Sequence, residues 1–167
     1  DIKWSGNTIA IAGNDNKILV FDSRTSKAIQ SIPTNTTADI TSISFHSSGN
    51  CIGSGSSDQV VRIFDLRTTS LLQKHSAHTA PITRIAFSPF DDELISVGKD
   101  CYARIWNLKT ASIESCFKLE SSVAAGFHLQ KVSQLVVKIE EFVLTKRSIL
   151  QTILTNMNLM EETFYMH

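Results

Sequence analysis

Short apolar runs alternate with polar turns over the first 117 residues, and the pattern occurs three times, with its turn acids and run ends 42 or 43 residues apart. In each repeat an apolar run precedes a turn that contains Asp, and the next run ends in an aromatic residue followed by an acid or an amide. The repeated positions are the turn acids Asp15, Asp58 and Asp100, the run ends Phe21-Asp22, Phe64-Asp65 and Trp106-Asn107, and the earlier runs Ile2-x-Trp4, Ile43-x-Phe45 and Ile85-x-Phe87. Short apolar runs bounded by Gly, Asn, Asp and Ser predict β-strands.

Four strands are expected in each repeat, except that residues 1–4 look like the end of a first strand whose start is missing. The predicted strands cover residues 7–13, 17–22 and 27–32, then 40–45, 51–56, 60–65 and 71–75, and finally 82–87, 93–98, 103–107 and 113–117. The chain is therefore expected to hold about two and three-quarter four-stranded units.

A period in the low forties with four short strands per unit is typical of WD-repeat β-propeller blades. We therefore expect a mainly β fold, with a partial WD-repeat propeller of antiparallel blades in residues 1–117. Residues 118–128 are interpreted as a linker or the start of a degenerate blade, and residues 129–167 as an amphipathic or coiled-coil helix. Because a propeller closes with roughly four to eight blades, an incomplete ring would expose large apolar faces. Either the chain is part of a larger ring, or other chains cover its ends.

From Leu129 onward the apolar period becomes helical, with no Pro or Gly in the segment. The heptad a positions are Leu129, Val136, Val143, Leu150, Met157 and Phe164, and the d positions are Val132, Ile139, Lys146, Ile153 and Met160. Ten of these eleven positions are apolar, which predicts one long helix that buries this stripe. The residues expected at its interface are Val136, Ile139, Val143, Leu150, Ile153, Met157 and Met160. The helix is expected either to associate with another chain or to dock on the blades.

Composition argues against several classes of function. Sixteen basic and sixteen acidic residues give a formal net charge of zero, without the basic cluster that nucleic-acid binding requires. Apolar stretches are too short for a membrane span, and the chain starts at Asp without a signal-type segment, as expected for numbering that begins inside a longer protein. The cysteines, Cys51, Cys101 and Cys116, are unclustered, which favours reduced cytosolic thiols over disulfides or a metal site. Cys101 is expected to be a small strand residue, and no cofactor is expected.

The third repeat contains His78, Ser96, Asp100 and Trp106, a set that resembles the residues of nucleophilic catalysis. The same spacing resembles the structural network of WD-repeat blades, which implies that His78 bridges Asp100 and Ser96, and that Ser96 meets the Trp106 indole. We prefer the structural interpretation, so no catalytic residue and no enzyme activity are expected. Partial sets occur in the other repeats, as Ser54, Asp58 and Phe64 in the second and Asp15 and Phe21 in the first. The position in the second repeat that is equivalent to His78 lies near Thr36.

Residues 41–117 resemble the later blades of the proteome-of-centriole (Poc-type) WD-repeat proteins. The resemblance rests on Phe45-His46-x-Ser48-Gly49, Cys51-Ile52, Asp65-Leu66-Arg67-Thr68, Leu71-Leu72-Gln73 and His78-Thr79-Ala80-Pro81. It implies a scaffold of the cytoplasm and cytoskeleton that binds tubulin or other centriolar proteins at centrioles or ciliary basal bodies. In that family seven blades precede the coiled-coil segment, whereas here the helical tail follows the third repeat almost directly.

The leading interpretation is therefore a non-enzymatic WD-repeat scaffold for protein–protein interaction in microtubule or centriole assembly. The alternative is a substrate receptor of a cullin-type ubiquitin ligase, because Asp65 and Arg67 resemble the Asp-x-Arg box that docks the ligase adaptor. In the structural interpretation of the same motif, the Asp caps a turn and the Arg is solvated. A hydrolase would need a solvent-open Ser96, for which the sequence gives no support.

Overall fold

The computed structural model describes residues 1–25, 27–88 and 92–119, and all of them belong to one unit, Asp1–Phe127. The first repeat forms strands β1 (Ile2–Ser5), β2 (Thr8–Ala12), β3 (Lys17–Asp22) and β4 (Lys27–Pro33). The second forms β5 (Ile40–Phe45), β6 (Cys51–Ser56), β7 (Val61–Asp65) and β8 (Leu71–His75), and the third forms β9 (Ile82–Phe87), β10 (Glu93–Gly98), β11 (Tyr102–Asn107) and β12 (Ser112–Lys118).

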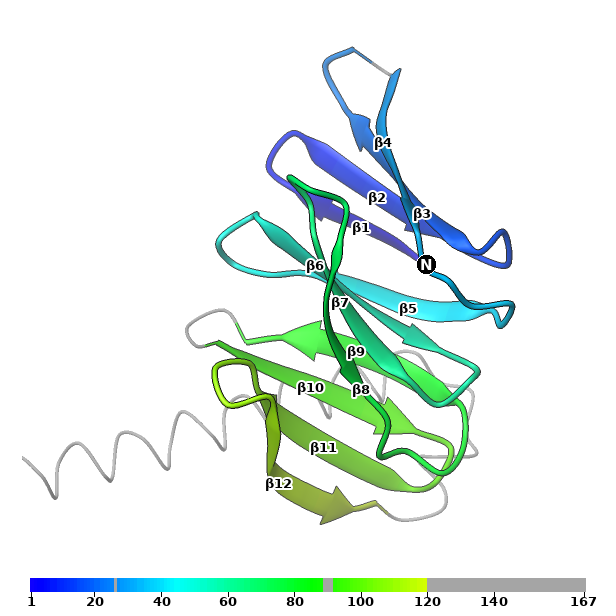
Figure 1. Cartoon of the computed structure of the whole chain (residues 1–167), viewed down its shortest axis with the longest axis vertical. Helices are drawn as coiled ribbons and strands as arrows, with labels where there is room; N and C mark the ends of the chain where they lie inside the picture. Colours follow the sequence, from blue (N-terminus) through cyan, green and yellow to red (C-terminus); the bar gives the residue numbers. More distant parts are fainter. Residues whose placement is uncertain (26, 89–91, 120–167) are drawn as a thin grey trace, which may run out of the picture. The chain divides into compact units, whose positions relative to one another are not determined.

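Each repeat forms its own four-stranded antiparallel sheet, with strands in the order of the sequence (Figure 1). The predicted β fold of four-stranded blades is thus confirmed. The first sheet differs from the expectation of a partial unit, because β1 is present and pairs with β2 from Ile2 to Ser5. It is shorter than β5 and β9, with four residues against six. We call the three sheets blade 1, blade 2 and blade 3.

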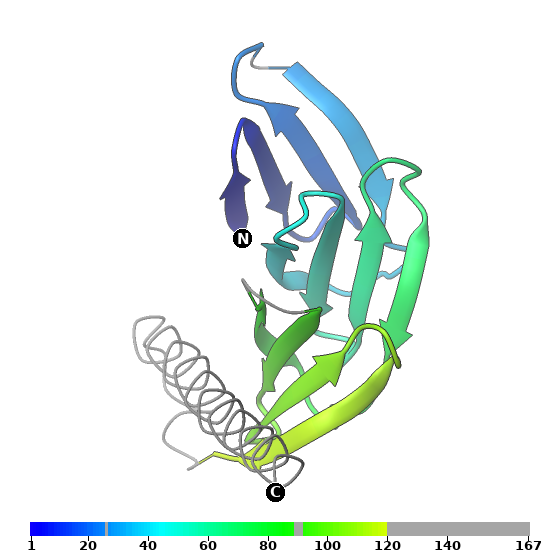
Figure 2. The same ribbon diagram turned by 90° about the vertical axis from the view of Figure 1, so that its left-hand side faces the viewer.

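Neighbouring blades pack face to face, and Figure 2 shows the sheets following one another from blade 1 in blue to blade 3 in green and yellow. Side chains of blades 1 and 2 form one buried cluster, which includes Ala10, Val20, Ile43 and Phe64. Side chains of blades 2 and 3 form a second, which includes Ile63, Ile85, Leu94 and Trp106. Each interface is thus built from two faces. The preceding blade contributes its trailing face, which carries Ala10 and Val20 in blade 1, and the following blade contributes its leading face, which carries Ile43 and Phe64 in blade 2.

Polar side chains on the inner strands reinforce these interfaces at a fixed spacing. Asp1 Oδ2 accepts a hydrogen bond from the backbone N–H of Ile43 at 3.0 Å. One repeat later, Ser42 Oγ accepts from the N–H of Ile85 at 3.2 Å. Asp1 and Ser42 occupy the same position of successive repeats. The same hydrogen bond between neighbouring blades therefore recurs once per repeat.

The turn between the second and third strands has the same backbone conformation in all three blades. Asn16, Gln59 and Cys101 follow the turn acids, and their φ angles are 58°, 72° and 63°. Cys101 is therefore a turn residue in the left-handed region, and the expectation that it lies in a strand is wrong. The preceding Asp imposes this turn by accepting from backbone N–H groups, as Asp100 Oδ1 does from Tyr102 N at 3.2 Å.

The expected linker at 118–128 and the amphipathic helix at 129–167 fall almost entirely outside the described residues, which end at residue 119. The heptad stripe, including Val136, Leu150 and Met160, stays a prediction. No candidate membrane-spanning helix is found within the described ranges.

Candidate functional site

The structure brings His78, Ser96, Asp100 and Trp106 together in one hydrogen-bonded chain. Trp106 Nε1 on β11 donates to Ser96 Oγ on β10 at 2.8 Å, and this oxygen lies 2.7 Å from His78 Nε2. His78 Nδ1 lies 3.0 Å from both carboxylate oxygens of Asp100. The chain links two strands, the β10–β11 turn and the segment before β9.

One arrangement of protons satisfies every group in the chain. The indole of Trp106 can only donate, so Ser96 Oγ accepts from it and directs its own proton to His78 Nε2. His78 then carries its proton on Nδ1 and donates to Asp100. Arg104 Nη1 donates to Asp100 Oδ2 at 2.8 Å. It also lies 2.6 Å from His78 Nδ1, a contact that is a hydrogen bond only in the other tautomer, with the imidazole proton on Nε2.

The network is sealed from solvent. The side chains of His78 and Asp100 are 0% and 2% exposed, and Ser96 is 0% exposed. Gly98, at the end of β10, lies against the pair, because a Cβ at this position would come within 2.6 Å of His78 Nδ1. Only glycine leaves room for this contact.

Burial and the neighbouring charges set the protonation states. Burial lowers the pKa of His78 below its usual value and outweighs the opposing effect of Asp100, while Arg104 lowers it further. Burial alone would raise the pKa of Asp100, but hydrogen bonds from His78, the Thr79 backbone and Arg104 outweigh it and hold this pKa below its usual value. The site therefore holds a neutral imidazole beside an ionised carboxylate at neutral pH.

Blade 2 has a reduced version of this network. Thr36 takes the place of the His, and its Oγ1 donates to Asp58 Oδ2 at 2.9 Å. Arg62 binds the same carboxylate through both terminal nitrogens, at 3.1 Å and 2.7 Å. Burial opposes these bonds, but the hydrogen bonds from Arg62, Thr36 and Ser56 lower the pKa of Asp58 to about 2. Ser54 is buried, but Phe64, at the position equivalent to Trp106, has no side-chain N–H to offer.

In blade 1, Asp15 is not part of such a network. Its carboxylate faces Lys17 at 3.8 Å, with both side chains close to half-exposed. Phe21 is half-buried and pairs across the strands with Ile9. The first blade thus lacks the Arg that binds the turn acid in the other two.

Arg62 and Arg104 were missed as network members. Each follows the turn acid by four residues and precedes the strand-end aromatic by two, and each is less than a tenth exposed. An Arg stands at this place in the second and third repeats, with Leu19 in the first, and this recurrence is a signal in the sequence. It was overlooked because Arg is usually solvated.

The arrangement offers little for chemistry. A nucleophilic Ser needs an open approach and donors for an oxyanion, whereas Ser96 lies between strands with its oxygen occupied by Trp106 and His78. Among the described residues, no group of three or more His, Cys, Asp or Glu side chains could hold a metal ion.

The Asp-x-Arg motif lies at the exit of β7. Asp65 Oδ1 accepts from the backbone N–H groups of Arg67 at 2.6 Å and Thr68 at 3.2 Å, and Arg67 is exposed. Asp65 therefore caps this turn. Adaptor docking through Arg67 stays a prediction.

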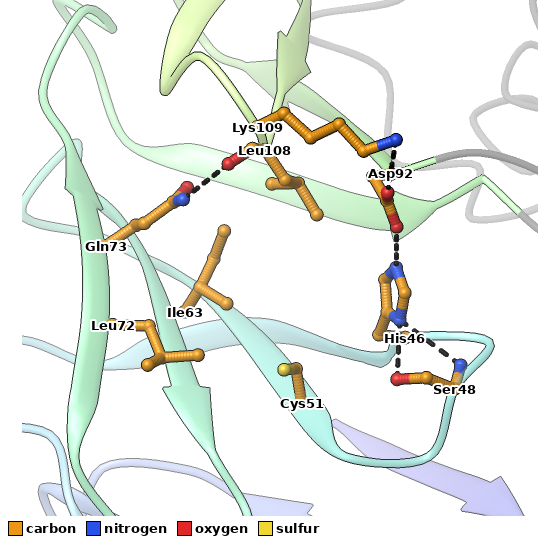
Figure 3. Close-up of a pocket in the computed structure, with 9 residues that line it drawn as sticks. All are labelled: His46, Ser48, Cys51, Ile63, Leu72, Gln73, Asp92, Leu108 and Lys109. Atoms are coloured by element: carbon orange, nitrogen blue, oxygen red, sulfur yellow. Dashed lines mark hydrogen bonds and ion pairs between the residues drawn. The ribbon is translucent and has the colours of Figure 1, made fainter.

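A surface pocket of about 220 Å³ lies at the junction of blades 2 and 3 (Figure 3). Its apolar part is formed by Ile63, Leu72 and Leu108, with the Cys51 thiol beside them. Burial raises the pKa of this thiol, so Cys51 is not an activated nucleophile.

Polar side chains line the other part of the pocket (Figure 3). His46 Nδ1 lies 2.8 Å from Ser48 Oγ, and its Nε2 lies 3.3 Å from Asp92 Oδ1. His46 Nε2 makes no hydrogen bond in this second contact. Lys109 Nζ lies 3.1 Å from Asp92 Oδ2, and this hydrogen bond lowers the pKa of Asp92 below its usual value. Opposite charges are paired at the rim, so the pocket is suited to an apolar group rather than to an ion.

Comparison with known proteins identifies the repeats. A family model described as nucleolar protein 10-like, N-terminal domain, a β-propeller, matches residues 5–165. No curated protein matches the chain.

Two solved structures share the fold, those of U3-55K and of the RRP9 WD40 repeats. Each has a TM-score of 0.64 and 18% sequence identity, and the match covers 67% of this chain. It covers 36% and 35% of the two neighbours, so the chain spans about a third of their length. At this identity the likeness shows the WD-repeat fold alone.

Proposed function

The chain belongs to the nucleolar protein 10-like N-terminal domain family of β-propellers, and from this we propose that it is a non-enzymatic scaffold that binds other proteins. The observation that carries the proposal is a contrast within blades 2 and 3. The Ser–His–Asp set is sealed and internally satisfied, whereas the pocket between the blades is open and offers an apolar interior. WD-repeat propellers are generally scaffolds, and this distribution of polar and apolar groups is suited to that role.

Recognition of an apolar side chain fits the pocket best. Ile63 and Leu108 come from different blades, so a ligand there would also bridge the blade junction. Leu72 on β8 is 50% exposed at the same site, and its burial by a partner would contribute about 1–2 kcal/mol. Partner proteins that present an exposed Leu, Ile or Phe are therefore the class we propose.

The cellular setting has two candidates. The name of the family supports a nucleolar location and nucleolar protein partners. The resemblance of residues 41–117 to Poc-type proteins supports centrioles or basal bodies and tubulin instead, although neither solved neighbour carries a centriolar name. We propose the nucleolar setting, since it rests on a match over nearly the whole chain.

Proximity labelling with the tagged full chain tests both parts of the proposal. We expect enrichment of nucleolar proteins and fluorescence in nucleoli. A Leu72→Glu variant should lose a discrete subset of partners, because the charge lies at the pocket. Ile29→Glu is the matched control, since Ile29 is 53% exposed at the equivalent place on β4 but does not line the pocket. Centriolar fluorescence would contradict the nucleolar setting, and identical partner sets for both variants would contradict the role of the pocket.

A further inference from the structure

Among the described residues that line the pocket between blades 2 and 3, Asp92 carries the carboxylate (Figure 3). Its backbone is fixed, because the carbonyl of Asp92 accepts from the N–H of Leu108 at 2.8 Å. Its side chain lies beside His46, whose Nε2 is 3.3 Å from Asp92 Oδ1. Since a short side chain on a fixed backbone has little freedom to move, the negative charge of Asp92 stays at the rim of the pocket.

His46 is held beside this carboxylate by contacts on its other sides. Its Nδ1 accepts from the backbone N–H of Ser48 at 3.2 Å, which places the proton of the neutral ring on Nε2, the nitrogen that faces Asp92. The His46 ring also packs edge-on against Phe87, with the ring centroids 5.2 Å apart. Because His46 Nε2 makes no hydrogen bond and a carboxylate accepts about four, both oxygens of Asp92 keep room for a further donor.

The cation that is paired with Asp92 is held loosely. Lys109 Nζ lies 3.1 Å from Asp92 Oδ2, but the Lys109 side chain is 77% exposed and that of Asp92 is 43% exposed. An ion pair this open to solvent is weak, because water screens both charges and the long Lys side chain loses rotamer freedom when it is held. A cation from a partner can therefore displace Lys109, which would remain solvated.

Packing of the blades does not require the carboxylate. At the junction of blades 1 and 2 the equivalent residue is Asn50, and its carbonyl accepts from the N–H of Leu66 at 2.8 Å. This is the contact that Asp92 makes with Leu108 one blade later. An exposed apolar residue recurs there too, as Ile29 on β4. The two junctions thus share the backbone contact and differ in the acid, which leaves the charge of Asp92 available for recognition.

A second carboxylate adds to the negative potential of the pocket. Burial, and after it the charge of Asp65, raises the pKa of the Cys51 thiol, which lines the pocket. Two negative charges, those of Asp92 and Asp65, thus act at the pocket, whereas Lys109 is the one Lys or Arg among the described residues that line it. Electrostatic complementarity therefore favours a ligand with a positive charge beside its apolar group.

We propose that the pocket recognises a segment of a partner protein in which an apolar side chain lies close in sequence to an arginine. The apolar side chain contacts Leu72 and Leu108, and the guanidinium replaces Lys109 on Asp92. Arginine fits better than lysine, because its planar fork donates to both oxygens of a carboxylate at once. This inference rests on the proposed scaffold function and specifies the partner of the same pocket.

Titration of the isotopically labelled full chain with short peptides, followed by amide NMR shifts, tests the proposal. The probes are the peptide Gly-Gly-Leu-Gly-Arg-Gly-Gly and the same peptide with Gln or Glu in place of Arg. We expect all of them to shift the amides around Leu72 and Leu108, and Leu72→Ser to weaken all of them. The Arg peptide should bind about fivefold more tightly than the Gln peptide at low salt, and this difference should shrink as the salt concentration rises.

Variants of the two charged residues assign the preference to its source. Asp92→Asn should abolish the preference for Arg and leave the affinity for the Gln peptide unchanged, because the apolar interior is intact. Lys109→Ala removes the competing cation and should tighten binding of the Arg peptide roughly twofold. Glu114→Gln is the matched control, since Glu114 is an exposed acid on β12 that does not line the pocket, and it should change no affinity.

The outcomes separate this inference from the proposed function. Equal affinities for the Arg and Gln peptides, or a preference for Arg that survives in Asp92→Asn, would overturn the inference. The pocket would keep its proposed role in either case if Leu72→Ser weakens both peptides. Tighter binding of the Glu peptide would also overturn the inference and would make Lys109 the recognition group. Absence of amide shifts at the pocket with every peptide would contradict both proposals.

Discussion

The hydrogen-bond network of blade 3 depends on single atoms. Trp106 Nε1 has no counterpart in blade 2, where Phe64 occupies the equivalent position. Trp106→Phe removes the N–H that reaches Ser96 Oγ at 2.8 Å and is expected to lower the free energy of unfolding by about 1–2 kcal/mol. The reverse change, Phe64→Trp, should gain little, since Thr36 rather than a His binds the turn acid of blade 2. Urea unfolding of both variants checks this. Equal and opposite changes at the two sites would show that the His78 network adds nothing to blade 3.

Gly98 offers a second residue-level test. A Cβ there would come within 2.6 Å of His78 Nδ1 and 2.8 Å of Asp100 Oδ1, so Gly98→Ala must displace the pair and should cost about 1–3 kcal/mol. Gly13 ends the same strand region of blade 1, and nothing lies within 4 Å of a Cβ there. Gly13→Ala is therefore expected to be neutral or to stabilise by up to about 1 kcal/mol. Similar losses in urea midpoint for both variants would contradict the close packing of the His–Asp pair.

The pH dependence of stability follows from His78. Its pKa is lowered by burial from the ordinary value of 6.5, so the unfolded chain binds the proton more readily than the folded one. The contribution of neutral His78 to the free energy of unfolding is fully present above pH 6.5 and is lost as the pH falls through and below that value. His78→Asn should flatten the change in urea midpoint between pH 7.5 and pH 5, and the remaining slope should belong to His75, whose pKa burial also lowers. A variant as acid-sensitive as the parent would contradict this role of His78.

At the scale of elements, the strands could be predicted closely because local chemistry sets their ends. The predicted bounds of β3, β5 and β6 are those of the structure. Side-chain partners in another blade could not be predicted, because they depend on how the sheets pack. Gln73 Nε2, for example, donates to the carbonyl of Leu108 in blade 3 at 2.6 Å, and its Oε1 lies 3.1 Å from His75 Nε2. The only sign of this contact in the sequence is that Gln30 stands at the same place one repeat earlier.

The same contact recurs one blade earlier, where Gln30 Nε2 donates to the carbonyl of Leu66 at 2.5 Å. These two glutamines therefore fasten the outer strands β4 and β8 to the following blade. Gln73→Ala should lower the free energy of unfolding by about 1 kcal/mol and speed amide exchange around Leu108 only. Gln30→Ala is the control and should affect the junction of blades 1 and 2 instead. Uniform exchange changes across all three blades would contradict this division.

At the scale of the whole molecule, the described residues keep their reactive groups inside and their apolar recognition surfaces outside. His78, Ser96 and Asp100 are buried and hydrogen-bonded to one another, whereas Leu72 is 50% exposed at the pocket. The sequence period could predict the blades, but not the pocket between blades 2 and 3. That outcome depends on packing partners and not on the repeat itself.

The most direct test of the scaffold proposal is the reactivity of Ser96 in the folded full chain. A fluorophosphonate labels a serine only if the hydroxyl is open and activated. With Ser96 0% exposed between His78 and Trp106, we expect intact-mass spectrometry to show no adduct at Ser96 under conditions that fully label a serine protease. A stoichiometric adduct on Ser96 that disappears in Ser96→Ala would contradict the scaffold and identify an enzyme.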